Sequence, residues 1–195
     1  DEIAIQLHKM GFKAVMTEGA KHILSWKSPN YVYSSSAAPK LKVLLRNSHL
    51  SDEIAFHFSD PAWHNFPMEA EKFANILTEL PEEEQVVNIW VGAETFGLRQ
   101  SATTGIFDFL KALPYYALEQ SMGFMTPGEV AKQIATKDAV VVPYPLTWAG
   151  EAKDLSIFNG NDLQQEALQK LYAVAERVHL CRDKQLKHDW LILQD

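Results

Sequence analysis

The chain has 195 residues, of which 47% are hydrophobic and 22% are charged. This composition is typical of a folded globular protein and excludes an intrinsically disordered one. There are 18 Lys and Arg residues against 25 Asp and Glu residues, so the net charge is −7, which argues against binding to the phosphate backbone of a nucleic acid. No apolar stretch approaches the ~20 residues that span a bilayer, so a membrane partner is not expected.

The single cysteine, Cys181, excludes an intramolecular disulfide and fits a reducing compartment. The first residues already follow an amphipathic pattern in which Ile3, Leu7 and Met10 share one face. The last residues come directly after an apolar run over 190–193. We therefore expect the chain to be a piece of a longer protein, with some of its chemistry elsewhere.

In chain order, the patterns first predict a helix up to Gly11, a buried strand over 12–16, a helical piece over 20–24, and short strands over 31–33 and 41–45. Ser51 is expected to cap a helix, while Phe56 and Phe58 fit either helix or strand. Further on, the patterns predict a helix over 68–80, a buried strand over 86–91, a helix over 104–113 with a second piece from Pro114, a helix over 126–134, and a strand over 139–142.

The alternation of strands and helices up to about residue 145 predicts an α/β layer with parallel strands. From Asn161 onward the pattern is helical only, with Leu163 and Leu168 on one apolar stripe and a second helix over 182–193. The sequence thus predicts an α/β part over 1–145 and an appended helical part over 146–195.

The first candidate site is the segment Val91 to Gly97, at the carboxyl end of the predicted strand 86–91. Active-site groups gather at this edge of parallel α/β sheets. Glu94 is costly to bury without hydrogen bonds, so it needs partners or a solvent-lined cleft. The alternative interpretation, a structural carboxylate that caps the next turn, is equally consistent with the spacing.

The second candidate site follows a Pro-Tyr-Pro loop and contains Trp148 beside acids and amides. An aromatic ring can cover the apolar face of a pyranose while polar groups bind its hydroxyls. The alternative is that Trp148 packs in a core, and for Asn161 and Asp162 a helix-capping role is favoured. His57 and His64 lack a standard ligand spacing, and no nucleotide-binding glycine loop is present, so neither a metal nor a cofactor is expected.

Four stretches of the chain resemble glycoside hydrolase family 57, specifically its α-amylase-type branch. They occur in the family order, and each has a counterpart in the family's "TEG…IL-W-SPN", "LSDDI-F-F", "MDYETFGEHQ…TGIFEFL" and "SWADEERDLSAWLGN" regions. These stretches are Thr17 to Asn30, Leu50 to Phe58, Glu94 to Phe107, and Trp148 to Asn161.

The resemblance implies an incomplete seven-stranded (β/α) barrel, followed by a helical bundle, that acts on α-glucans by a retaining mechanism. Residues 1–145 would be the C-terminal part of that barrel, with the missing barrel segments upstream of residue 1. A nucleophile and a general acid do the chemistry, and the family's Glu nucleophile is expected outside this chain. The resemblance also implies a cytoplasmic location and an α-glucan or maltooligosaccharide partner. It places candidate substrate-binding residues at Glu18, Trp26, Phe96, Trp148 and Asp154.

The position of the family's general acid, the Asp of "MDYETFG", is Gly92 in this chain. Glycine cannot donate a proton, and loss of a positioned acid typically costs ~10²–10⁴-fold in rate. Glu94 lies two residues further on. If the strand stays extended, its carboxylate is expected roughly 6–7 Å beyond the family position, at about 3.3 Å per residue.

Three hypotheses follow for the function. The first is an α-glucan-binding homologue whose hydrolysis is impaired or lost. The second is an active α-glucan hydrolase or 4-α-glucanotransferase in which Glu94 is a displaced acid. The third, from another class, is a non-catalytic interaction protein that uses the barrel only as a surface. The sequence ranks them in this order.

Overall fold

The computed structural model describes residues 1–150 and 152–194, which form two compact units, Asp1–Tyr144 and Pro145–Asp195. The first unit is an α/β structure built on a mixed four-stranded sheet in the order β1-β3-β2-β4. The strands are β1 (Ala14–Glu18), β2 (Tyr33–Ser35), β3 (Lys42–Arg46) and β4 (Asp138–Val140). The α/β class predicted from the sequence is confirmed, and within the described ranges the sheet comprises these four strands.

Strand β3 is central, because it pairs in parallel with β1 and in antiparallel orientation with β2. The expectation of purely parallel strands is therefore wrong at β2. The short connection between β2 and β3 is long enough for an antiparallel pair but not for the helical crossover that a parallel pair needs.

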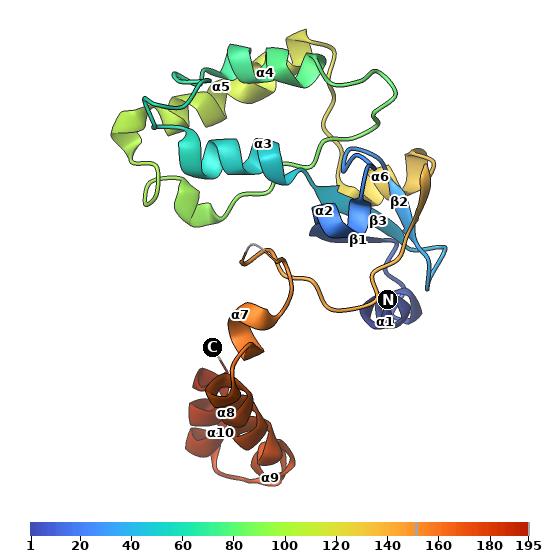
Figure 1. Ribbon diagram of the computed structural model, residues 1–195, viewed down its shortest axis with the longest axis vertical. Coiled ribbons are helices and arrows are strands. Elements are labelled where there is room, and N and C mark those ends of the chain that lie inside the picture. Colours follow the sequence, from blue (N-terminus) through green and yellow to red (C-terminus); the bar gives the residue numbers. More distant parts are fainter. Residues whose placement is uncertain (151, 195) are drawn as a thin grey trace. The chain divides into compact units, whose positions relative to one another are not determined.

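The two faces of the sheet are covered by different helices, α2 (Lys21–Leu24) and α6 (Pro127–Gln133) (Figure 1). Side chains alternate along β3, so Val43 and Leu45 pack with Leu24 of α2, whereas Leu44 packs with Val130 of α6. Helix α6 begins with the predicted capping box, in which Thr126 and Glu129 bond reciprocally.

The larger core of the first unit lies among helices. Figure 1 shows α4 (Ala70–Thr78) beside α5 (Ile106–Glu119), with α3 (Ser48–Asp52) and the π-helical segment η1 (Glu53–His57) in the same region. Phe58, Phe73 and Phe109 meet edge to face in this core. Of the two residues that fit either helix or strand, Phe56 lies within η1 and Phe58 is the C-cap residue of η1, so neither is in a strand. Helix α5 also continues through Pro114 rather than beginning a second piece there.

The predicted buried strand over 86–91 is wrong in two respects. The segment forms a single bridge, Arg46↔Asn88, and its residues are only half-buried. Val87, Ile89 and Val91 nevertheless pack on the helical core. Val86 packs between the sheet and α6, in the cluster that contains Leu44 and Val130. The apolar run reflects this alternating packing, whereas a strand also requires a continuous row of backbone hydrogen bonds to a neighbouring strand, and within the described residues only one bridge forms here.

The remaining helix of the first unit is α1 (Glu2–Lys9), where Ile3 keeps 65% exposure. Helices α7 (Ser156–Asn159), α8 (Asp162–Ala173), α9 (Ala175–Leu180) and α10 (Lys184–Ile192) follow in the second unit. Asn161 caps α8 as predicted, but the expected apolar stripe on this helix stays exposed, with Leu163 at 79%. Two 3-10 turns, η2 (Ala93–Thr95) and η3 (Ala102–Thr104), complete the first unit's helical elements.

Candidate functional site

The carboxyl ends of β1 and β3 bring charged side chains to one edge of the sheet. Because the two strands are parallel and in register, Glu18 at the end of β1 stands opposite Arg46 at the end of β3. The segment that leads to Gly92 joins the same edge, where Asn47 donates its backbone N–H to the carbonyl of Asn88 at 2.9 Å. This is the edge at which parallel α/β sheets collect their functional groups.

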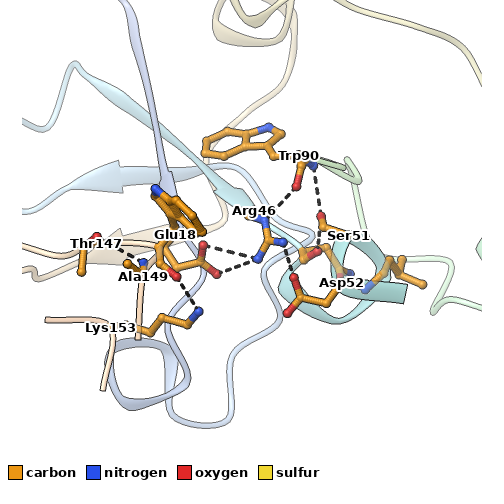
Figure 2. A network of polar contacts seen from close by, with 11 residues as sticks. Glu18, Arg46, Ser51, Asp52, Trp90, Thr147, Ala149 and Lys153 are labelled. Carbon is orange, nitrogen blue, oxygen red and sulfur yellow. Dashed lines mark hydrogen bonds and ion pairs between the residues drawn. The ribbon is translucent and has the colours of Figure 1, made fainter. Parts of the chain in front are cut away.

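Arg46 organises this edge through three contacts (Figure 2). Its Nη1 lies 3.3 Å from Glu18 Oε1, its Nη2 bonds Asp52, and its Nε donates to the Trp90 carbonyl at 2.9 Å. The side chains of Arg46 and Glu18 are only 11% and 3% exposed, so the pair is held in a desolvated setting. The rigid guanidinium fork therefore joins β1, α3 and the segment before Gly92.

A second set of hydrogen bonds fixes the same segment to α3. The Ser51 hydroxyl donates to the Asn47 carbonyl at 2.6 Å and accepts the Trp90 N–H at 3.0 Å. Asn47, not Ser51, caps α3, because its side chain accepts the Leu50 N–H. The prediction of Ser51 as cap is wrong, and this hydroxyl instead anchors the backbone of Trp90, two residues before Gly92.

Beyond Gly92 the backbone turns instead of staying extended. Residues 93–95 form the 3-10 turn η2, and the Glu94 side chain folds back over Gly92. A Cβ atom on residue 92 would lie 2.1 Å from Glu94 Oε1 and 2.3 Å from Oε2. The expectation that this carboxylate lies 6–7 Å further along is therefore wrong, because that spacing assumed an extended strand.

Arg99 is the ionic partner of Glu94. Its Nη2 lies 3.7 Å from Glu94 Oε1, its backbone N–H donates to the Glu94 carbonyl at 2.8 Å, and its guanidinium stacks 4.6 Å from the ring centroid of Phe56. The Glu94 side chain is 47% exposed, so it lies at the surface of the sheet edge and not in an apolar pocket. The sequence patterns did not predict Arg46 or Arg99 as site residues. For Arg46, its place at the carboxyl end of a predicted strand is a signal that could have identified it.

The other candidates of the first unit differ in accessibility. Trp26 is 87% exposed, so its ring is free to contact a ligand. Phe96 is half-buried and packs against the helical core. Glu18 is buried and already engaged by Arg46, and this contact supplies the partner that a buried carboxylate requires.

Trp148 and Asp154 belong to the second unit. Trp148 is 70% exposed, and its carbonyl accepts a 2.8 Å hydrogen bond from Lys153 Nζ. Asp154 Oδ1 accepts the Ser156 N–H at 2.9 Å, at the start of α7. Residue 151 of this segment lies outside the described residues. The alternative in which Trp148 packs in a core does not hold for its 70% exposed side chain.

Within residues 1–150 and 152–194, no set of three or more His, Cys, Asp or Glu side chains is grouped to hold a metal ion. None of the helices in those ranges has the length and apolar character needed to cross a membrane.

Comparison with known proteins supports the resemblance. The profile of glycosyl hydrolase family 57 matches residues 1–143. A curated protein of Methanocaldococcus jannaschii named "Putative alpha-amylase" is 39% identical over 165 residues, covering 83% of this chain and 34% of that protein. The chain thus spans about a third of this relative's length. No solved structure matches significantly. The match over most of its length, together with the four motif stretches, shows that the chain belongs to glycosyl hydrolase family 57.

Proposed function

We propose that this chain is part of an active α-glucan hydrolase or glucanotransferase in which Glu94 replaces the missing general acid. The observation that carries the proposal is the Glu94 carboxylate, whose Oε1 lies 2.1 Å from the place of a Cβ on residue 92. A carboxyl group thus occupies the space from which the family's Asp side chain would extend. We also propose that the sheet is part of the incomplete seven-stranded barrel implied by the family.

In the proposed mechanism, the Glu94 carboxyl group donates its proton to the glycosidic oxygen as the bond to the anomeric carbon breaks. The nucleophile expected outside this chain attacks that carbon and forms a glycosyl intermediate. Glu94, now a carboxylate, then takes a proton from an incoming water or sugar hydroxyl as its oxygen attacks the anomeric carbon. The bond between that carbon and the nucleophile breaks, so the nucleophile is released as a carboxylate and Glu94 is protonated again. Arg46 and Ser51 position the backbone that leads to this acid, through the carbonyl and the N–H of Trp90.

A second candidate function, α-glucan binding with impaired hydrolysis, has one observation in its favour. Proton donors of glycosidases are typically set in apolar surroundings that favour the protonated form. Glu94 is instead 47% exposed and lies 3.7 Å from the Arg99 guanidinium, so its surroundings are polar. On this hypothesis Glu94 accepts hydrogen bonds from sugar hydroxyls, and the chain belongs to a pseudoenzyme.

The two functions are separated by measuring turnover and binding on the same full-length protein. We expect release of reducing ends from maltooligosaccharides, together with saturable binding in a calorimetric titration. Binding without measurable release would overturn the first function in favour of the second. If neither is detected, the protein is a non-catalytic interaction module and both are wrong.

The Trp148→Ala substitution should weaken oligosaccharide binding about 2- to 12-fold, because loss of one aromatic stacking contact costs about 0.5–1.5 kcal/mol. Since the side chain is 70% exposed, the free energy of unfolding should change by less than about 0.5 kcal/mol. Calorimetry and denaturant unfolding measure the two quantities. Leu163→Ala, at a 79% exposed apolar residue of the same unit, is the control that should leave affinity unchanged. An unchanged affinity in Trp148→Ala would remove this residue from the binding surface.

A further inference from the structure

A cavity of about 690 Å³ lies in the first unit, and neither Gly92 nor Glu94 lines it. Its walls come from the chain that follows β1, from the beginning of α3 and η1, from residues 64 and 65, and from the end of α4. It adjoins the edge described above through Gly19 and Asn47, but neither Glu94 nor Arg46 lines it. A volume of this size accommodates a small organic ligand.

Glu53, the first residue of η1, lines this cavity with a side chain that is only 4% exposed. One carboxylate oxygen has weak partners, since Oε1 lies 3.4 Å from Asn65 Nδ2 and 3.6 Å from His49 Nε2. The other oxygen, Oε2, is buried and has no hydrogen-bond partner within the described residues. A buried carboxylate oxygen without a donor is costly, so this site is one where a ligand can supply the missing donor.

The charges around the cavity favour a cation. Three acids line it, Glu53, Glu79 and Glu84, against two lysines, Lys21 and Lys27. Lys27 is already neutralised, because its ammonium lies 2.5 Å from Asp138 Oδ2, and this hydrogen bond lowers the pKa of the Asp138 carboxyl. The net charge of the lining side chains is therefore negative. Glu53, the most buried of the three acids, is also the one with a buried carboxylate oxygen that lacks a hydrogen-bond donor among the described residues.

The apolar residues of the lining indicate the chemical nature of the uncharged part of the ligand. Leu24, Leu50, Ile76 and Leu80 form an apolar wall. None of the residues that line this cavity in the described part of the chain is Trp, Tyr or Phe, so it offers no ring on which a pyranose could stack. Among the described residues that line it, no three His, Cys, Asp or Glu side chains are grouped to hold a metal ion either. A ligand that matches this lining has an aliphatic chain, which contacts the leucines, and an ammonium group at one end, which binds Glu53.

We propose that this cavity binds a small aliphatic ammonium compound, with the Glu53 carboxylate as the anchor for the cationic nitrogen. The ammonium group donates a charge-assisted hydrogen bond to the Glu53 carboxylate, while the methylene groups contact Leu50 and Leu80. The proposal is independent of Glu94, because neither Glu94 nor Gly92 lines the cavity.

The probes are 1,4-diaminobutane and its neutral counterpart 1,4-butanediol, each titrated calorimetrically into the full-length protein. We expect saturable 1:1 binding of the diamine and at least tenfold weaker binding of the diol. Glu53→Gln should lower diamine affinity at least tenfold, whereas the matched control Glu79→Gln, at an exposed acid on the rim, should lower it less than threefold.

A second variant, Leu80→Trp, fills the cavity and leaves Glu53 unchanged. We expect it to abolish diamine binding. It tests the site independently if Glu53→Gln does not fold. Absence of saturable diamine binding overturns the proposal. Equal binding of the diol overturns the cationic class of ligand, and unchanged affinity in both Glu53→Gln and Leu80→Trp assigns the diamine to another site.

Discussion

Replacing Glu94 by Gln should lower kcat on maltooligosaccharides by about 10²–10⁴-fold while leaving their affinity nearly unchanged. The amide keeps the size of the side chain and its place over Gly92, but it has no acidic proton for the departing sugar oxygen. Initial rates of reducing-end release and calorimetric titration measure the two effects. Because a sugar alkoxide is a poor leaving group, the loss should lie toward the upper end of this range.

A matched control for this substitution is Glu166→Gln. Glu166 is also a partly exposed acid with an ionic partner, since its Oε1 lies 2.6 Å from Lys170 Nζ. It should retain the full rate. Full rate in Glu94→Gln as well would show that Glu94 is not the acid.

The double variant Gly92→Asp with Glu94→Gln tests whether the two positions share one role. A side chain on residue 92 displaces only the flexible end of residue 94, so the fold should accept it. We expect turnover at least tenfold above that of Glu94→Gln alone. If the unsubstituted protein instead binds without turnover, the single Gly92→Asp variant is the one that should gain activity.

Replacing Arg46 by Leu should lower the free energy of unfolding by about 3–5 kcal/mol, the usual cost of removing one partner of a buried ion pair. Glu18, with its side chain 3% exposed, would keep a buried charge without its counterion, and the Trp90 carbonyl would lose its donor. Denaturant unfolding of the full-length protein measures the loss.

The double variant Arg46→Leu with Glu18→Leu removes both charges and should recover a large part of this loss. Lys170→Ala is the surface control, because its partner Glu166 is exposed and such pairs contribute about 1 kcal/mol or less. A loss below about 1 kcal/mol for Arg46→Leu would show that the network is not a structural support.

Local signals in the sequence predicted the parts of the fold that depend on nearby residues. The Thr126 and Asn161 caps and the strand around Val43 are present as expected, because capping and alternation act over a few positions. The segment 86–91 shows where this reasoning fails. Its β-branched run is a local property, whereas strand pairing depends on neighbours distant in sequence.

The candidate site divides in the same way. The segment around Glu94 was identified from its motif and its place after an apolar run, but its geometry was not, since a 3-10 turn replaced the expected extension. The sequence did not predict that Ser51 binds the Trp90 backbone, because Ser51 was expected to cap the helix. Asn47, four residues earlier, is the cap instead. Arg46 joins groups from β1, α3 and residue 90, and no local pattern encodes such a convergence.

The space shared by residue 92 and the Glu94 carboxylate bears on how such a site can evolve. Glycine leaves room for the neighbouring acid, and the nearest atoms to a Cβ on residue 92 belong to the flexible end of the Glu94 side chain. Under the proposed function, moving the proton donor between positions 92 and 94 would then need no rearrangement of the surrounding backbone. One substitution at residue 92 would restore the aspartate of the family motif beside an acid that is already in place.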